Sequence, residues 1–182
     1  MSNPVSALNG ASFQGFASIR EIGPVGMITL RAKGVMGLDK AVKAVVGTKL
    51  PAQRRIEVNG DRACGWMSPD EYLLILPYAE VRDALASLAK ALAGEHHLAV
   101  DVSDARAVFR VEGDKADQVL AKLSPVDFAT LEPGELRRTR TAQVAAAMWS
   151  QDGGFTVVCF RSVAGYVMGL LTHSAQPGSE LA

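Results

Sequence analysis

The sequence predicts an α+β fold made of two similar halves, each with helices packed against an antiparallel sheet. Three observations support this fold class. Short apolar runs with strand character alternate with amphipathic helical segments, the order of these elements starts again midway, and glycines and prolines separate them. The pattern is that of the split βαβ arrangement, in which two helices cover one face of a four-stranded sheet.

The first half, at about residues 19–102, is expected to run β-α-β-β-α-β. Gly47 and Gly94 stand where helix C-cap glycines belong, and Asn59-Gly60 favours a tight hairpin turn. Ser68-Pro69-Asp70-Glu71 has the composition of a helix start, but the apolar run after it predicts a turn leading into a buried strand. Strands are expected at 24–32, 54–58, 72–76 and 98–102, and helices at 38–46 and 79–94.

The second half, at about residues 103–173, repeats the pattern as β-α-β-β-α and is one strand short. Strands are expected at 107–111, 139–150 and 155–160, and helices at 115–123 and from Ser162 onward. Residues 1–18 are too poor in apolar groups to build a core and are expected to form a flexible arm. This arm is a candidate for the missing strand. Residues 174–182 are expected to fray.

The two halves meet at Asp101–Asp104, where two carboxylates flank Ser103. Two acids this close could serve as a general acid and base. They could also cap a turn between strands, since Asp and Ser form local hydrogen bonds there. No His, Lys or Cys nearby completes a catalytic set, so the turn is the favoured interpretation.

Composition excludes several classes of partner. Lys plus Arg total 19 and Asp plus Glu total 19, so the formal net charge is zero and no field favours nucleic acid or an anionic membrane. Cys64 and Cys159 have no metal-site spacing, and buried thiols in a reducing compartment are expected. With no signal-like or membrane-spanning run, a cytoplasmic protein is expected.

The remaining polar motifs favour structural roles. Asp70 and Glu71 stand on the Ser-Pro turn, where acids suit the first turn of a helix. His96 and His97 are adjacent and His173 is far from them, so no zinc site is expected. The glycines form no nucleotide-binding fingerprint. The sequence therefore predicts no catalytic, cofactor or metal residue on this chain.

Several residues are candidates for a protein interface. Two aromatic residues of the arm could anchor it on a partner, two tryptophans are either core or anchor groups, and a basic cluster either protects a sheet edge or binds a partner's anion. These candidates are Phe13, Phe16, Trp66, Trp149, Arg137, Arg138 and Arg140.

Five segments in this order resemble the gamma subunit of bacterial heterotetrameric sarcosine oxidase. They are ITLRA (28–32), GWMSPDEYLLILP (65–77), VDVSDARAVFRVEGDKADQVLAKLSPVDF (100–128), RTRTAQVAAAMW (138–149) and FRSVAGYV (160–167). The resemblance covers roughly residues 19–171. The third segment also resembles the aminomethyltransferase (T-protein) superfamily, whose fold has two ferredoxin-like halves.

The resemblance implies a non-catalytic role in an enzyme complex. Such a complex oxidatively demethylates sarcosine to glycine, forming hydrogen peroxide and, with tetrahydrofolate, methylenetetrahydrofolate. FAD and FMN would belong to the beta subunit, NAD and the folate site to alpha, and zinc to delta. The gamma subunit would carry no cofactor and would pack chiefly against alpha.

Two other functions are compatible with the sequence. One is a free-standing folate-binding aminomethyltransferase-like protein, for which Asp101 and Arg138 are the only suggestive acid and arginine. The other is a small-ligand regulatory module, because split βαβ folds host many functions.

Overall fold

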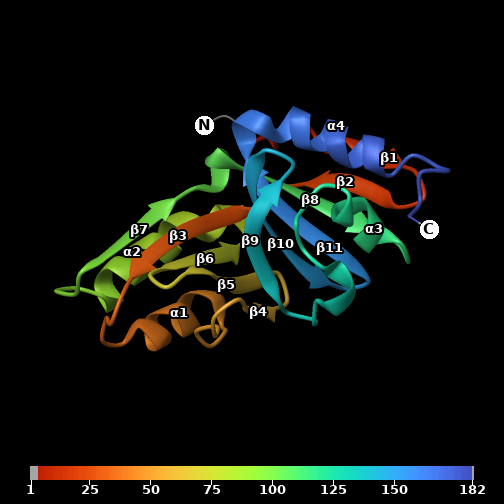
Figure 1. The fold of residues 1–182 in the computed structure, drawn as a ribbon. Coiled ribbons are helices and arrows are strands. Elements are labelled where there is room, and N and C mark those ends of the chain that lie inside the picture. Colours follow the sequence, from red (N-terminus) through yellow and green to blue (C-terminus); the bar gives the residue numbers. More distant parts are fainter. Residues whose placement is uncertain (1–3, 182) are drawn as a thin grey trace. The chain divides into compact units, whose positions relative to one another are not determined.

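The computed structural model describes residues 4–181 (Figure 1). The chain divides into two compact units. The central unit is Val25–Ser103, and the flanking unit combines the N-terminal segment up to Pro24 with the chain from Asp104 onward. Each unit has one antiparallel sheet with two α-helices.

The central unit has a five-stranded sheet in the order β4-β5-β6-β3-β7. A 3₁₀ turn at Tyr78–Glu80 precedes its second helix. Its elements are β3 (Gly26–Ala32), α1 (Leu38–Val46), β4 (Ile56–Asn59), β5 (Arg62–Ser68), β6 (Glu71–Leu76), α2 (Val81–Ala91) and β7 (His97–Asp101).

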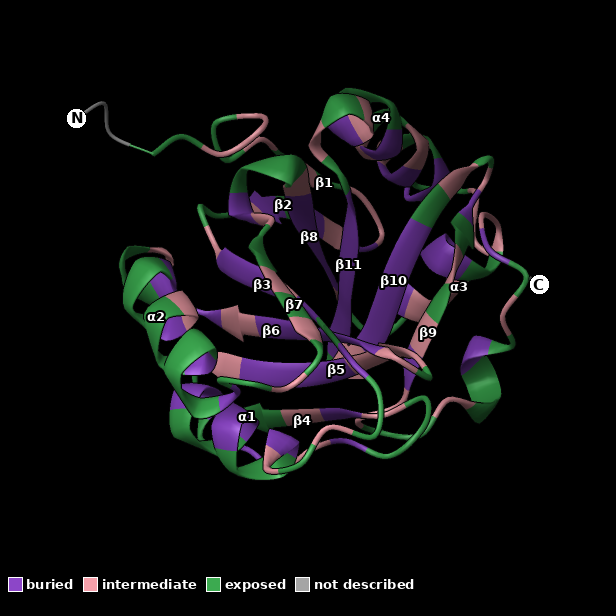
Figure 2. Ribbon diagram, turned by 90° about the vertical axis from the view of Figure 1, so that its left-hand side faces the viewer, coloured by how far each residue is buried: buried purple, intermediate pink, exposed green. Residues whose placement is uncertain are grey.

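The core of the central unit lies between this sheet and its two helices. Both helices have one buried and one exposed side, which Figure 2 shows as purple and green stretches. The inward side chains of α1 repeat at helical spacing, as an amphipathic helix requires. Gly47 ends α1 with φ of 71°, a left-handed conformation that glycine adopts without steric penalty. Fully buried members of this core include Ile28, Leu30, Val42, Leu74, Leu88 and Leu92.

The flanking unit has a six-stranded sheet in the order β1-β2-β8-β11-β10-β9. Short 3₁₀ turns at Ser103–Ala105, Phe128–Thr130 and Arg161–Val163 join some of its elements. These elements are β1 (Ser12–Gln14), β2 (Ser18–Ile22), β8 (Arg106–Glu112), α3 (Ala116–Ala121), β9 (Leu136–Thr141), β10 (Val144–Gln151), β11 (Gly154–Phe160) and α4 (Ala164–Ser174).

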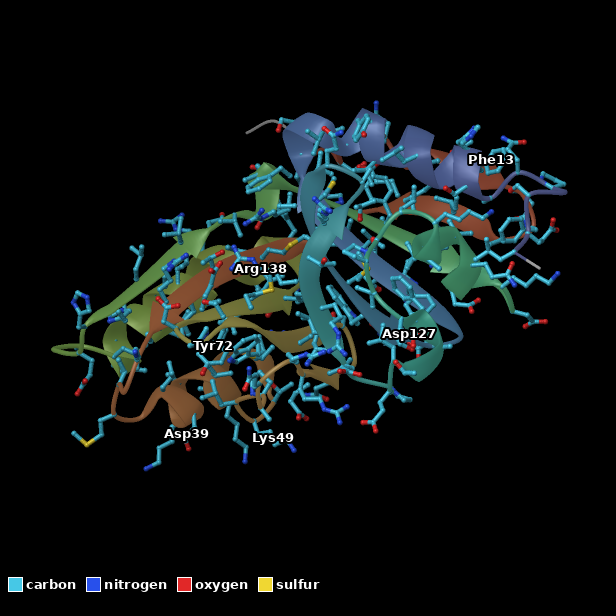
Figure 3. The ribbon with its side chains drawn as sticks, viewed as in Figure 1. Phe13, Asp39, Lys49, Tyr72, Asp127 and Arg138 are labelled. Atoms are coloured by element: carbon cyan, nitrogen blue, oxygen red, sulfur yellow. The ribbon has the colours of Figure 1, made fainter. Side chains whose placement is uncertain are left out.

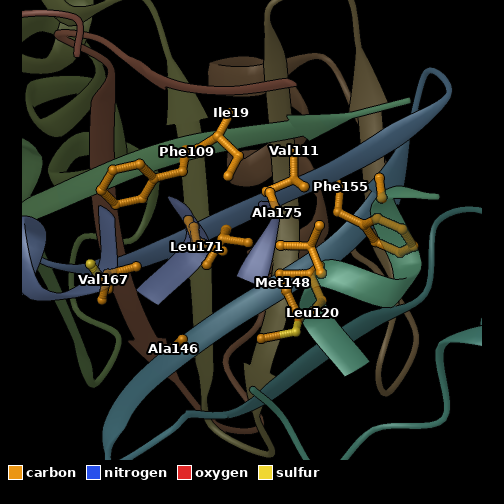
Figure 4. Close-up of a cluster of buried hydrophobic side chains, with 14 of the residues drawn as sticks. Ile19, Phe109, Val111, Leu120, Ala146, Met148, Phe155, Val167, Leu171 and Ala175 are labelled. Carbon is orange, nitrogen blue, oxygen red and sulfur yellow. The ribbon is translucent and has the colours of Figure 1, made fainter. Parts of the chain in front are cut away.

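The core of the flanking unit is a second cluster of buried apolar side chains (Figure 4). Phe155 meets Phe128 edge to face, with ring centroids 5.4 Å apart. The cluster draws on strands, both helices and the chain after α4, since Ala175 is fully buried. Other fully buried members include Ile19, Phe109, Val111, Val119, Leu120, Met148, Val157, Val167 and Leu171.

The two sheets share one strand order. In the central unit, β7-β3-β6-β5 is the 4-1-3-2 order of a split βαβ unit, and β4 is an added edge strand. In the flanking unit, β2-β8-β11-β10 has the same order, with β9 added at one edge and β1 at the other. The predicted fold class, α+β with two ferredoxin-like halves, is confirmed. The fourth strand of the flanking unit comes from the N-terminal end of the chain.

The division between the halves differs from the expected one because of that strand. β2 pairs with β8 from Ser18 to Ile22, so this segment belongs with the second half rather than the first. β1 then pairs with β2, which places three residues of the expected arm in the sheet. The first three residues of that arm lie outside the described range. A strand needs a hydrogen-bonded neighbour, and the neighbour here lies about ninety residues away in sequence.

Two strand predictions are corrected. Residues 139–150 were expected as one strand, but the chain turns after Thr141 and forms the hairpin β9–β10. Ala142 adopts φ of 51° in that turn, a conformation that an alanine does not signal in a sequence. β5 was not expected as a separate strand, since its centre, Ala63-Cys64-Gly65, lacks β-branched residues.

Candidate functional site

Asp101 and Ser103, at the C-terminal end of the central unit, form a hydrogen-bonded turn. Asp101 Oδ1 accepts hydrogen bonds from the Ser103 backbone N–H at 2.9 Å and from Ser103 Oγ at 2.6 Å. Ser103 Oγ in turn accepts from the Met27 backbone N–H at 2.9 Å. This carboxylate therefore fixes the end of β7 against the start of β3. The turn interpretation of Asp101 holds.

The acids of the Ser-Pro turn are also engaged within the central unit. Asp70 accepts a hydrogen bond of 2.7 Å from Ser68 Oγ, and this bond, with the Arg31 charge in addition, lowers the pKa of Asp70. Arg31 reaches Asp70 at 3.3 Å and Glu71 at 3.0 Å. Glu71 is only 5% exposed. These contacts join β3 to the β5–β6 turn.

The cysteines and histidines form no cluster with metal-binding geometry among residues 4–181. Cys64 and Cys159 are free and buried. Burial raises the pKa of the Cys64 thiol, and it raises that of Cys159 to about 11 against the opposing charge of Arg106. Neither thiol is ionised near neutral pH. No helix among residues 4–181 is long and apolar enough to cross a bilayer.

The aromatic residues of the N-terminal segment pack on their own unit. Phe13 and Phe16 are half-buried against the core of the flanking unit, and Phe13 is labelled in Figure 3. The Phe16 ring lies under the Lys122 ammonium at 4.9 Å, and the Phe16 backbone N–H donates to the Ala175 carbonyl. Phe16 thus links the N-terminal segment to Lys122 at the end of α3 through its ring, and to the chain after α4 through its backbone N–H.

The two tryptophans differ in exposure. Trp149 is 3% exposed, and its indole N–H donates to Gln151 Oε1 at 3.2 Å. Trp66 is half-buried against the core of the central unit. The Trp149 ring is thus interior to this chain, whereas part of the Trp66 ring stays at the surface.

The basic cluster lies on β9, an edge strand of the flanking unit (Figure 3). Arg138 and Arg140 stand opposite Ala147 and Ala145 of β10 and share one face, as predicted. Both are exposed, whereas Arg137 points to the other face and forms an ion pair with Glu135. The exposed pair of arginines suits edge protection and partner binding equally.

Three buried or half-buried polar groups organise the flanking unit and were missed in the sequence. Glu21, which is 4% exposed, accepts from Ser6 Oγ at 2.8 Å and from the backbone N–H groups of Leu8 and Gly10 at 2.9 Å each. Lys122 donates to the Ser174 carbonyl at 2.8 Å and so satisfies the end of α4. A single Glu or Lys in a strand or helix carries no sequence signal for such contacts.

The third group is Arg110, which is 7% exposed in the middle of β8. It contacts Thr156, Glu112 and the carbonyl of Gln151. The pKa of Glu112 is lowered, first by the hydrogen bond from Arg20 at 3.2 Å and then by Arg110. All of these contacts hold strands and turns together.

The central unit also has an open groove of about 410 Å³ between α1 and α2. Arg62 lies in it and is engaged at both ends, donating to the Val45 carbonyl at 3.1 Å and to Glu80 at 2.5 Å. Its other lining residues include Lys43, Asn59, Asp83 and Ser87. The groove walls carry both signs of charge, and the central cation is already paired.

Comparison with known proteins gives one consistent relationship. The sarcosine oxidase gamma subunit family model matches residues 34–174. The sarcosine oxidase subunit gamma of Corynebacterium sp. (strain P-1) is 35% identical over 125 residues, which is 67% of this chain. That match spans 60% of the length of the Corynebacterium protein.

Two solved structures are similar in fold. A chain of the heterotetrameric sarcosine oxidase from Corynebacterium sp. U-96 matches with a TM-score of 0.79 and 25% identity over 87% of this chain and 83% of that one. The glycine cleavage system aminomethyltransferase T from Bartonella henselae matches with a TM-score of 0.66 and 11% identity, over 90% of this chain and 47% of that one. The second match concerns the fold alone. With the family model covering most of its length, the chain belongs to the sarcosine oxidase gamma subunit family.

Proposed function

We propose that this chain is a non-catalytic gamma subunit of a heterotetrameric sarcosine oxidase. The observation that carries the proposal is the family match over residues 34–174, together with the structural match to a chain of the heterotetrameric enzyme. The complex would oxidatively demethylate sarcosine to glycine, forming hydrogen peroxide and, with tetrahydrofolate, methylenetetrahydrofolate. This chain would stabilise the assembly without touching the reacting atoms.

The polar groups of the chain support a structural role. Asp101 is engaged by Ser103, and Asp70 by Ser68 and Arg31. A general acid or base must reach a substrate proton within hydrogen-bond distance, and these carboxylates are already used in turns. Asp101 and Arg138, the pair considered for a folate-binding protein, belong to different units.

The partners and cofactors follow from the same proposal. Alpha, beta and delta subunits would complete the heterotetramer, with this chain packed chiefly against alpha. FAD, FMN, NAD, tetrahydrofolate and zinc would reside on those partners. Exposed Arg138 and Arg140 are candidate contacts with them. The two free cysteines fit a reducing compartment, so the complex is assigned to the cytoplasm.

Size-exclusion chromatography tests the proposal. The chain is expressed with and without the three other subunits, and elution is followed at protein and flavin wavelengths. We expect it to move into a large yellow species that oxidises sarcosine. A stable, colourless monomer that never enters the flavin peak would contradict the proposal, and binding assays with folates and amino acids would then test the two alternative functions.

A further inference from the structure

Two of the three asparagines of this chain, Asn9 and Asn59, are followed by glycine. The third, Asn3, precedes Pro4, whose nitrogen carries no hydrogen. In an Asn-Gly pair the backbone nitrogen of the glycine can attack the asparagine side chain, because glycine has no side chain to obstruct the approach. Both pairs have this chemistry, so a difference in their reactivity comes from the structure.

Both Asn-Gly pairs lie in exposed turns. Asn9 and Gly10 form a turn before β1, and Asn59 and Gly60 lead into the hairpin turn between β4 and β5. All four residues are exposed. A Cβ added at Gly10 or at Gly60 would meet nothing within 4 Å, so steric crowding hinders neither nitrogen.

The two glycine nitrogens differ in their hydrogen bonds. The Gly10 N–H donates to Glu21 Oε2 at 2.9 Å, and Glu21 is 4% exposed. The Gly60 N–H donates to no acceptor among the residues that the structure describes. A backbone nitrogen attacks only after it has lost its proton, and a carboxylate that accepts this hydrogen bond both retains the proton and repels hydroxide. The Gly10 nitrogen is therefore protected, and the Gly60 nitrogen is not.

From this contrast we infer that Asn59 is a site of spontaneous deamidation and that Glu21 protects Asn9 from the same reaction. Base removes the proton of the Gly60 N–H, and the nitrogen then attacks Asn59 Cγ. A bond forms between these two atoms, the Cγ–Nδ2 bond breaks, and ammonia leaves behind a succinimide ring. Water opens the ring at either carbonyl and gives aspartate or isoaspartate at position 59. The reaction consumes water, needs no oxidant or reductant, and is independent of the proposed function.

Deamidation of Asn59 would change the open groove between α1 and α2. Asn59 lines this groove together with Lys43 and Arg62. A Cβ added at Gly47 would lie 2.4 Å from Asn59 Nδ2, so the amide lies against the C-terminal end of α1. The product puts a carboxylate at this place, and isoaspartate also adds a methylene to the backbone where Asn59 pairs with Arg62. The modification therefore alters both the charge of the groove and the β4–β5 hairpin.

Peptide mapping of the aged full-length chain tests the inference. The folded protein is incubated at mildly alkaline pH, and mass spectrometry follows the deamidated fraction at each Asn-Gly pair. We expect Asn59 to react about tenfold faster than Asn9 or more, since a protected nitrogen reacts only on local opening. In denaturing urea the two rates should become similar, because the hydrogen bond to Glu21 is lost there. Similar rates in the folded protein, or a difference that persists in urea, would overturn the inference.

Two variants test the two residues separately. Glu21→Ala removes the acceptor of the Gly10 N–H and should raise the rate at Asn9 toward that at Asn59, which stays unchanged. Asn59→Gln is the matched control, since a glutamine side chain must close a larger ring and reacts far more slowly. The formal net charge of the chain is zero, so isoelectric focusing resolves the acidic product, and this product should be nearly absent in Asn59→Gln.

Each variant has an outcome that contradicts its part of the inference. An unchanged rate at Asn9 in folded Glu21→Ala would overturn the protective role of Glu21. An acidic product that forms as fast in Asn59→Gln as in wild type would overturn the assignment of Asn59. The comparison in urea uses the wild-type chain alone, so it decides the protective role even where Glu21→Ala does not fold.

Discussion

Arg110 Nη1 donates a hydrogen bond of 3.0 Å to Thr156 Oγ1, its direct opposite across β8 and β11. The same guanidinium donates to the Gln151 carbonyl at 2.9 Å and to Glu112 Oε1 at 3.2 Å. One buried cation thus fixes the β8–β11 pairing and the turn between β10 and β11. A guanidinium can do this because it offers several donors in a rigid plane.

Arg110→Met should destabilise the chain markedly. The substitution leaves the Thr156 hydroxyl and the Gln151 carbonyl without their donor, and an unsatisfied buried polar group costs about 1–3 kcal/mol. We expect the free energy of unfolding, measured by urea titration, to decrease by at least about 1–3 kcal/mol relative to wild type. Arg20→Met is the matched control, since the Arg20 side chain is 49% exposed and its ion pair contributes about 0–1 kcal/mol. Equal losses in the two variants would contradict a special role for Arg110.

Glu112→Gln should destabilise the chain at neutral pH, and this effect should disappear at acid pH. The pKa of Glu112 is lowered by Arg20 and then by Arg110. A lowered pKa in the folded state gives stability that is present above the unfolded pKa and is lost as the pH falls through the folded pKa. We expect the variant to be less stable than wild type at neutral pH by about 0.5–1 kcal/mol, since the side chain is 34% exposed.

Urea titration across a pH series measures this difference. The gap between Glu112→Gln and wild type should narrow as the pH falls below about 4, where carboxyl groups take up protons. A gap that is constant with pH would show that charge at Glu112 plays no part.

Glu21→Ala should release the N-terminal segment. Glu21 accepts hydrogen bonds from Ser6, Leu8 and Gly10, so its removal leaves these groups to water. We expect hydrogen exchange to accelerate at the Leu8 and Gly10 amides while the strands of the central unit keep their protection. Arg161→Met is a useful comparison, because Arg161 also donates to this segment, at the Val5 and Ser6 carbonyls. Unchanged exchange at Leu8 would contradict the role of Glu21.

Two glycine-to-alanine substitutions should change the stability of the chain in opposite directions. A Cβ added at Gly154 would lie 2.3 Å from the Val111 carbonyl oxygen, so Gly154→Ala forces the β8–β11 pair apart and should lower the melting temperature. A Cβ at Gly165, on α4, meets nothing within 4 Å. Gly165→Ala should therefore stabilise the free chain by up to about 1 kcal/mol through helix propensity. A melting temperature lowered by Gly165→Ala would contradict this account.

The native thiols should resist alkylation until the chain unfolds. Burial raises the pKa of Cys159 to about 11 and also raises that of Cys64. A raised folded pKa gives stability that is present below the unfolded pKa and is lost as the pH rises through the folded pKa. We expect Cys159 to lower the free energy of unfolding as the pH rises from its ordinary value of 9.0 toward about 11. Cys159→Ala should make this slope shallower and leave the part that Cys64 contributes. Reaction of the native protein with a thiol reagent near neutral pH would contradict the expected resistance to alkylation.

The sequence by itself determined the fold class and most of the elements. The spacing of apolar residues, with glycine and proline at the breaks between segments, predicted the positions of β3, α1, β6, α2, β7, β8, α3 and β11. The spacing is informative because it reflects which side of each element is buried. The turn at Asp101 and Ser103 followed from residue type, since Asp and Ser bond to neighbouring backbone. Family-specific segments indicated the sarcosine oxidase gamma subunit family, which the family model confirms.

Tertiary structure decided what depends on contacts between distant residues. The pairing of β2 with β8 joins the N-terminal segment to the second half, and no local pattern around Ser18–Ile22 specifies that partner. The roles of Glu21 and Arg110 could not be predicted from the sequence either. A charged residue in a strand is expected to face solvent, and only the tertiary structure shows that these two are buried. The exposure of Leu98 and Val100 was hidden for the opposite reason. An apolar strand predicts burial, and only the sheet order shows that β7 lies at an edge with those side chains in water.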